Sequence, residues 1–99
     1  MDKRVELTGF RDIDEPTKDL VDRNITKHLH RIQELTSKFE HLHITLKRVH
    51  TKEKGEKYEI HGKLLDNGKV YVSEFTDRNL LKVVDGVIEK IISEIEKNK

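Results

Sequence analysis

The sequence predicts an α+β domain in which two amphipathic helices cover one face of a four-stranded sheet. Four short segments alternate apolar and polar residues, which is the period-two pattern of half-buried strands. Two longer segments repeat apolar residues at the spacing of an amphipathic helix. The expected order is therefore strand, helix, strand, strand, strand, helix. An antiparallel sheet with both helices on one face buries all of these apolar stripes together.

The first strand and the first helix are expected at the N-terminal end of the chain. Residues 4–10 alternate apolar and polar side chains, with Phe10 on the polar side. Asp14-Glu15-Pro16 is typical of a helix start, because an acidic side chain caps free N–H groups and proline fits the first turn. The helix is expected to end near Ser37. The apolar stripe of this helix comprises Leu20, Val21, Ile25, His28, Leu29, Ile32, Leu35 and Phe39. His28, the histidine on this stripe, is expected to pack against its neighbours.

Three further strands are expected between the helices. In residues 41–50, HLHITLKRVH, aliphatic residues form one side, and histidine, threonine and lysine form the other. Residues 51–57 are expected to form a charged turn, and Tyr58 to Leu65 the next strand. Asp66-Asn67-Gly68 is typical of a tight hairpin turn, since Asn and Gly accept left-handed backbone angles. The last strand then runs from Val70 to Phe75.

The second helix is expected to follow directly, with Thr76 or Asp77 as its cap. Its apolar stripe is wide, which favours burial beneath the sheet. Gly86 in the middle costs about 1 kcal/mol relative to alanine, and we expect it to permit close packing against the first helix. The stripe comprises Leu80, Leu81, Val84, Val87, Ile88, Ile91 and Ile95.

Length and composition limit the functions that are open to this chain. Its 99 residues predict a single domain, residues 1–99. Its 20 Lys and Arg residues against 19 Asp and Glu leave a net charge of +1, so any basic surface must be local. Without cysteine there is no disulfide framework and no thiolate ligand. The charged N-terminus and the lack of an apolar run of about 18 residues predict a cytoplasmic protein without a membrane partner. We expect a monomer in solution.

Neither an enzyme nor a cofactor is predicted. The serines lack the glycine elbow of a nucleophile, and the glycines stand singly rather than in a phosphate-cradling loop. The uncovered face of the sheet is expected to carry Arg4, His41, His43, Lys47, His61 and Lys63. Three imidazoles can bind zinc, but the nearby lysines repel a dication and no carboxylate has a fixed spacing to them. We therefore expect no metal, and this face is either solvated or turned toward a polyanion.

A basic ridge is expected on the outer side of the first helix. Arg23, Lys27 and Arg31 are spaced by four residues and so stack along one helix face. Charges of one sign at this spacing oppose each other by a few tenths of a kcal/mol, a strain that a polyanion would relieve. Asp22 and Glu34 offer the alternative that the ridge is neutralised as part of a solvated face.

The last third of the chain resembles a known family. Asn67-Gly68 matches the family's hairpin, Asn79-Leu80-Leu81 stands where the family has Asp-Met-Tyr, and Val83-Val84-Asp85 matches its Ala-Ile-Asp. Lys90-Ile91 matches its Lys-Leu, and Ser93-Glu94 stands where it has Arg-Gln. With these matches and the expected order of its elements, the chain resembles, from Val5 to Lys97, the short ribosome hibernation-promoting factors and ribosome-associated inhibitors, also called sigma factor modulation proteins.

The resemblance implies a cold-shock, stationary-phase or stress factor that needs no cofactor. Such a factor sits in the mRNA and tRNA channel of the small ribosomal subunit, contacts 16S-type rRNA rather than DNA, and blocks translation. Ribosomal RNA is recognised mostly through phosphates and shape, for which scattered Lys and Arg side chains suffice. Ridge, sheet and second-helix cations together give the expected rRNA contacts, which are Arg23, Lys27, Arg31, Lys47, Lys63, Lys82, Lys90 and Lys97.

Two other functions remain open on the sequence. A protein-interaction or self-associating module without an RNA partner would use the open sheet face, and the near-neutral charge suits it. A double-stranded-RNA-binding domain has a similar layout of helix, three strands and helix, but its basic loop before the last helix is absent from residues 75–79. Sedimentation with ribosomes at low and high salt distinguishes these hypotheses.

Overall fold

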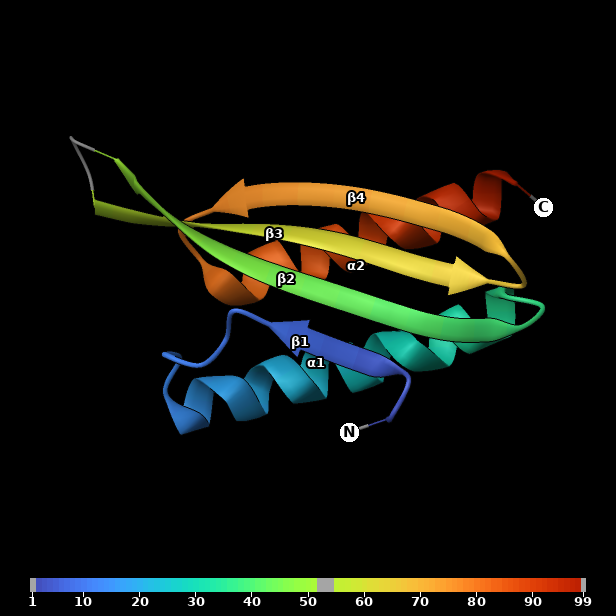
Figure 1. Cartoon of the computed structure of the whole chain (residues 1–99), viewed down its shortest axis with the longest axis horizontal. Helices are drawn as coiled ribbons and strands as arrows, with labels where there is room; N and C mark the ends of the chain where they lie inside the picture. Colours follow the sequence, from blue (N-terminus) through green and yellow to red (C-terminus); the bar gives the residue numbers. More distant parts are fainter. Residues whose placement is uncertain (1, 52–54, 99) are drawn as a thin grey trace.

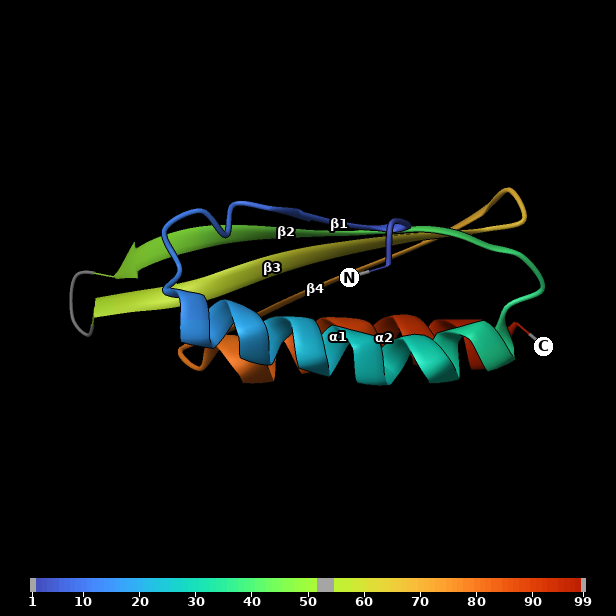
Figure 2. The ribbon, with the colours of Figure 1, turned by 90° about the horizontal axis from the view of Figure 1, so that it is seen from below.

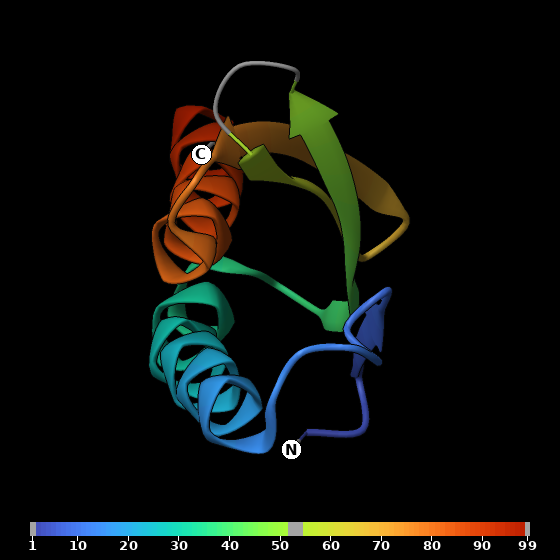
Figure 3. The same cartoon turned by 90° about the vertical axis from the view of Figure 1, so that its left-hand side faces the viewer.

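The computed structural model describes residues 2–51 and 55–98 and has the predicted order of elements (Figure 1). Figure 2 and Figure 3 show both helices on one face of the four-stranded sheet, which confirms the α+β class. Of the helices in the described residues, neither is long and apolar enough to cross a membrane. The elements are β1 (Val5–Thr8), α1 (Glu15–Leu35), β2 (Phe39–Thr51), β3 (Gly55–Asp66), β4 (Lys69–Asp77) and α2 (Leu80–Lys97).

The strands lie in the order β1-β2-β3-β4, so β1 and β4 form the two edges (Figure 1). β1 runs parallel to β2, with Val5 opposite Leu42, whereas the other two pairs are antiparallel. The wholly antiparallel sheet expected from the sequence is therefore wrong for β1. The reason is that α1 acts as a crossover connection, which returns the chain so that β2 starts beside the beginning of β1.

Alternation along the strands turns large apolar side chains toward the helices. Leu42, Ile44 and Leu46 are at most 5% exposed, which confirms the two faces predicted for residues 41–50. Ile60 and Leu64 of β3 are fully buried beside them. The helix residues that complete this core are Val21, Ile25, Leu29 and Ile32 of α1 and Leu80, Val83, Val84, Val87, Ile88, Ile91 and Ile95 of α2.

The start of α1 is capped as predicted. The carboxylate of Asp14 accepts hydrogen bonds from the backbone N–H of Thr17 at 3.1 Å and from the hydroxyl of the same residue at 2.9 Å. Pro16 lies in the first turn, where its missing N–H costs no hydrogen bond. These residues fix the point at which the chain turns from the sheet into the helix layer.

The end and the margin of α1 differ from the prediction. The helix stops at Leu35, before Ser37, because Thr36 is extended and bonds to the carbonyl of Ile32 with its hydroxyl and its N–H. Phe39, expected on the helix stripe, is buried in β2 instead. The stripe is also narrower than expected. Leu20 lies at its margin and is 43% exposed.

β1 is shorter than predicted because the chain turns at Gly9. This residue has φ of 88°, in the left-handed region that favours glycine, and a Cβ there would collide with the carbonyl oxygen of Leu46. The turn redirects the chain toward the helices. As a result Phe10, expected on the polar side of the strand, is 6% exposed and packs in the core.

The tight turn between β3 and β4 is confirmed. Asn67 and Gly68 have φ of 50° and 83°, and they set Asp66 opposite Lys69. The turn between β2 and β3 begins later than expected, because β2 extends to Thr51 and β3 starts at Gly55. Of the turn predicted at 51–57, residues 52–54 lie outside the described residues.

The start of α2 differs from the prediction because β4 continues through Thr76 to Asp77. Asn79 is the N-cap, and its side-chain oxygen accepts a hydrogen bond from the backbone N–H of Lys82 at 3.2 Å. Neither Thr76 nor Asp77 caps the helix. Instead the carboxylate of Asp77 accepts a bond from the backbone N–H of Asn79 at 3.1 Å and so shapes the turn between strand and helix.

Gly86 permits close packing, but against the sheet rather than against the first helix. A Cβ at this position would lie 3.1 Å from the ring of Phe75 in β4, so the predicted partner is wrong. The buried residues of α2 also differ slightly from the predicted stripe. Val83, absent from the predicted stripe, is fully buried, whereas Leu81 is only partly buried.

Candidate binding surfaces

The basic ridge of Arg23, Lys27 and Arg31 lies on the exposed side of α1. The guanidinium Nη2 of Arg31 lies 2.9 Å from Oε2 of Glu96 in α2. Within residues 2–51 and 55–98, the acidic neighbours on α1 that the sequence suggested as neutralising partners form no ion pair with the ridge, and Arg23 and Lys27 have no acidic partner. Two of the three ridge cations are therefore available to an anionic partner.

The open face, meaning the side of the sheet away from the helices, carries the candidates Lys47 and Lys63. Strand pairing places Lys63 between His43 and Val72, and Lys47 beside Glu59. Carboxylates are as frequent as lysines on this face, so it is a mixed surface rather than a basic one. The open face comprises Glu6, Thr8, His41, His43, Thr45, Lys47, Val49, Lys57, Glu59, His61, Lys63, Leu65, Val70, Val72, Glu74 and Thr76.

The histidines of the open face form two groups, each paired with carboxylates. His41 and His43 place their Nε2 atoms 3.4 and 3.8 Å from the carboxylate of Glu6 on β1. His61 belongs to a second group, with its Nε2 2.6 Å from Oε2 of Glu59. In the described part of the chain no group of three or more potential ligands is arranged to hold a metal ion. Carboxylates thus lie beside all three imidazoles, and Nε2 of His43 also hydrogen-bonds to the hydroxyl of Thr8 at 2.8 Å.

His28 joins the two helices. Its Nε2 lies 3.1 Å from Oδ1 of Asp85 in α2, and its side chain is 20% exposed. The prediction of a packed histidine on the stripe of α1 is therefore confirmed. What the sequence does not indicate is its polar partner, which lies on a distant element.

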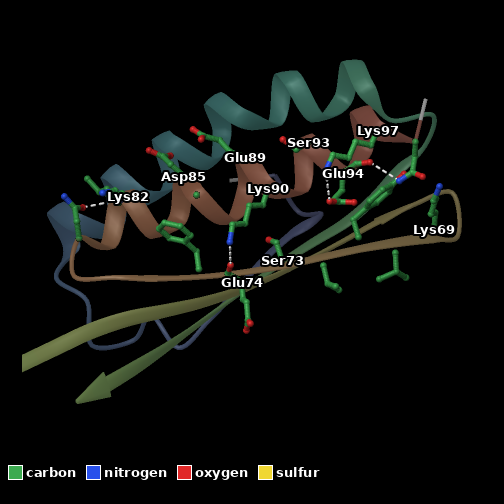
Figure 4. Close-up of a pocket in the computed structure, with 18 residues that line it drawn as sticks. Lys69, Ser73, Glu74, Lys82, Asp85, Glu89, Lys90, Ser93, Glu94 and Lys97 are labelled. Carbon is green, nitrogen blue, oxygen red and sulfur yellow. Dashed lines mark hydrogen bonds and ion pairs between the residues drawn. The ribbon is translucent and has the colours of Figure 1, made fainter. Parts of the chain in front are cut away.

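The last three candidates, Lys82, Lys90 and Lys97, line a groove of about 1320 Å³ between α2 and β4 (Figure 4). The Nζ of Lys90 donates to the backbone carbonyl of Glu74 at 2.9 Å and lies 5.0 Å from the centre of the Phe75 ring. Lys82 pairs with Asp77 at 3.5 Å, and Lys97 with Glu94 at 3.7 Å. Further carboxylates, Asp85 and Glu89, line the same groove, so its charge is mixed.

The predicted rRNA-binding residues are thus divided among three surfaces: the α1 ridge, the open face and the α2–β4 groove. The structure also brings together two cations that are not among the predicted residues. Arg48 and Arg78 both line a hollow of about 330 Å³ near the start of α1, and both are exposed. The sequence could have indicated that Arg48 is unusual, because a charged side chain interrupts the apolar side of the alternation at this position in residues 41–50.

Arg4, expected on the open face, is held at the start of β1. Its guanidinium carbon lies 4.7 Å from the centre of the Phe39 ring, and its Nη2 donates to Asp2 at 2.7 Å. This bond and a second from Nε of Arg4, together with one from its backbone N–H, hold the pKa of Asp2 down at about 2. Arg4 therefore contributes to local structure rather than to a free basic surface.

Comparison with known proteins identifies the fold. No protein-family model and no curated protein sequence matches the chain. The N-terminal domain of Protein Y from Thermus thermophilus superposes with a TM-score of 0.63 at 12% sequence identity, covering 100% of both chains. A ribosomal subunit interface protein from Coxiella burnetii superposes with a TM-score of 0.63 at 17% identity, covering 95% of this chain and 94% of that one. All three chains share one fold. The resemblance seen in the sequence is thereby confirmed at the level of architecture.

Proposed function

We propose that this protein is a non-catalytic, ribosome-binding stress factor of the cytoplasm. It occupies the mRNA and tRNA channel of the small subunit, contacts 16S-type rRNA and lowers translation. One observation carries the proposal: the chain has, over nearly its full length, the fold of a ribosomal subunit interface protein. Its partners are neither DNA nor membrane lipid.

Shape and charge support an RNA-lined binding site. The molecule is narrow, with extents of 43 × 25 × 18 Å, as a channel requires. Its net charge of +1 provides little bulk attraction to RNA, so affinity must come from local cations. Phosphate contacts from Lys and Arg position a protein on RNA without a base-reading motif.

The ridge on α1 is the best candidate for these phosphate contacts. Arg23 and Lys27 are exposed and have no acidic partner within the described residues. Each can therefore bind a phosphate without breaking an ion pair. Arg31 must first give up Glu96, so its contribution to affinity is smaller. The same reasoning applies to Lys82, Lys90 and Lys97, whose side chains already hold intramolecular contacts.

Co-sedimentation with purified 30S, 50S and 70S particles tests the proposal. The measurement is made at about 50 mM and about 200 mM salt, because phosphate-driven affinity falls steeply with salt. We expect pelleting with 30S and 70S particles at the lower salt, no pelleting with 50S, and reduced reporter yield in cell-free translation. Binding to none of the particles at low salt would refute the proposal and leave the protein-interaction hypothesis. Binding to 50S alone would refute the small-subunit site.

A further inference from the structure

β4 is a nine-residue edge strand whose outer backbone groups face away from the sheet. The tight turn makes Asp66 and Lys69 a hydrogen-bonded pair, and hydrogen-bonded positions alternate along an antiparallel ladder. Every second residue of β4 therefore points its N–H and C=O toward the free edge. The bond from Lys90 to the carbonyl of Glu74 fits this pattern. The residues whose backbone N–H and C=O groups point outward are Val70, Val72, Glu74 and Thr76.

The side chains on this edge provide little protection against another strand. Val70 and Val72 are 50% and 65% exposed, an unusual state for valines. Proteins commonly block free edges with short strands or with lysine and arginine side chains. β1 is only four residues long, and the part of β2 that extends beyond it carries Lys47 and Arg48. At the positions of β4 whose backbone groups point outward, in contrast, the side chains lie on the open face and are two valines, a glutamate and a threonine.

We infer that the occupant of this edge is β4 of a second copy of the chain, paired antiparallel about a two-fold axis at Ser73. Ser73 is the central residue of Lys69–Asp77, so this register pairs the whole strand with itself. It sets Lys69 opposite Asp77, which are opposite charges, and Tyr71 opposite Phe75, which are both aromatic. The sequence led us to expect a monomer, because strand order, and hence the identity of the edge, is not visible in it.

Neighbouring registers are poorer in cross-strand pairs. Moving the axis to Glu74 sets this carboxylate against its own copy, and like charges directly opposite are destabilising. Moving the axis to Val72 leaves Lys69 opposite Phe75 and separates the aromatic pair. The Ser73 register also sets Val72 and Glu74 of the two copies in hydrogen-bonded positions. The Glu74 carbonyl then accepts a backbone N–H in place of the Lys90 ammonium.

The groove beside β4 provides the space for this pairing. It runs along the edge between β4 and α2 (Figure 4). Tyr71, Phe75 and Leu81 belong to its lining. In an antiparallel edge-to-edge pair the two-fold axis is perpendicular to the sheet, so the helices of both copies lie on the same face. The side chains of the second strand that face the helices then enter the groove, and the two sheets join into one eight-stranded sheet. This inference stands apart from ribosome binding.

Sedimentation equilibrium from about 1 to about 500 µM tests the dimer, a range suited to an interface made by one strand pair. We expect the average mass to rise with concentration from that of one chain toward that of two. Val72→Lys, which places a charge on the exposed edge, should raise the dissociation constant about tenfold or more. The matched control is Val49→Lys, at a valine that is also on a strand and 38% exposed but lies on β2. It should leave dimerisation unchanged.

Cysteine cross-linking tests the register, since the natural chain has no cysteine. In the proposed pair Val72 faces Glu74 of the second copy at about 5.5 Å between Cα atoms, a span that a disulfide bridges. An oxidised mixture of Val72→Cys and Glu74→Cys chains should therefore form mixed dimers, whereas neither variant alone should cross-link. A wild-type chain that stays monomeric at about 500 µM, or dimers that are indifferent to Val72→Lys, would overturn the inference. Cross-linking of Glu74→Cys with itself would overturn this register.

Discussion

The two helices lie side by side under one sheet, but α2 is fixed to the strands more closely than α1. Figure 3 shows α1 on the β1 side of the layer and α2 on the β4 side. The Cα atoms of α2 approach those of β3 and β4 to within 8 Å at several positions, whereas the close backbone approach of α1 is to α2. Small residues explain the difference. Gly62 faces Val87 and Ile91, and the hydroxyl of Ser73 donates to the carbonyl of Val87 at 2.8 Å.

The cations on the two helices also differ in how many of them hold contacts within the protein. On α2, the cations Lys82, Lys90 and Lys97 all hold intramolecular contacts. On α1, Arg23 and Lys27 have no acidic partner in the described part of the chain. α2 is therefore held by contacts within the domain, whereas two exposed cations on the outer side of α1 have no acidic partner among the described residues. Mutations on the two helices should therefore have separable effects on stability and on binding.

The largest expected effect is a loss of stability from the buried side of α2. Ile91 is fully buried, so Ile91→Ala should lower the free energy of unfolding by about 2–5 kcal/mol through lost burial and a residual cavity. Ile92→Ala, at the adjacent and only partly buried position, is the matched control and should cost about 1 kcal/mol. Urea unfolding followed by circular dichroism measures both. Equal losses for the two variants would mean that α2 is not anchored as described.

The second effect concerns binding through α1. Charge reversal of the whole ridge, Arg23→Glu with Lys27→Glu and Arg31→Glu, should weaken ribosome binding by about ten- to a hundredfold, or about 1.4–2.7 kcal/mol. Each lost phosphate contact should lower the slope of log affinity against log salt by roughly 0.7–0.9. Stability should change little, because the ridge is exposed. The measurement is filter binding to 30S particles across a salt series.

Two comparisons make the ridge experiment specific. The triple variant Lys82→Glu with Lys90→Glu and Lys97→Glu changes the charge of α2 by the same amount, and we expect it to weaken binding less because these lysines already hold intramolecular contacts. Neutralising Asp22 and Glu34 on α1 should leave binding unchanged or strengthen it. If the ridge variant remains folded and binds with unchanged affinity and salt slope, the ridge is a solvated face and the open-face lysines become the candidates.

A third effect tests the small residues beneath β3 and β4. A Cβ at Gly62 would meet Cγ1 of Val87 at a distance that side chains do not adopt, and Cδ1 of Ile91 at 3.0 Å. Gly62→Ala should therefore cost about 1–3 kcal/mol of stability through overpacking. Gly86→Ala is the control, because the partly exposed ring of Phe75 can shift to accommodate its Cβ, and alanine favours a helix. Thermal unfolding that ranks the two variants in the opposite order would contradict this account.

Local patterns predicted the elements, whereas long-range pairing did not follow from them. The alternation of residues 41–50 and the Asn67-Gly68 turn are local signals, and the structure confirms both. That β1 runs parallel to β2, and that β4 is an edge, depends on which strands become neighbours. The site shows the same division. Helical spacing placed the ridge on one face, but the Arg31–Glu96 pair joins residues 65 apart and could not be read from spacing.

The smallest expected effect is the pH dependence of the α1 cap. Hydrogen bonds from the hydroxyl and backbone N–H of Thr17 lower the pKa of Asp14 from its ordinary value. A carboxylate whose pKa is lowered on folding stabilises the protein above its unfolded-state pKa, and this contribution is lost as the pH falls through the folded-state value. Stability of the wild type should therefore decline below about pH 4 in part through this cap.

Asp14→Asn isolates that contribution, because asparagine caps a helix about as well as aspartate but does not titrate. At pH 7 its melting temperature should match that of the wild type, whereas Asp14→Ala should melt a few degrees lower. Between about pH 4 and pH 2 the Asn variant should lose less stability than the wild type, and the gap between wild type and Asp14→Ala should narrow. Asp19→Asn, on the exposed side of the same helix, controls for the loss of one negative charge. If Asp14→Asn and Asp19→Asn respond to acid alike, the effect comes from the charge of α1 rather than from its cap.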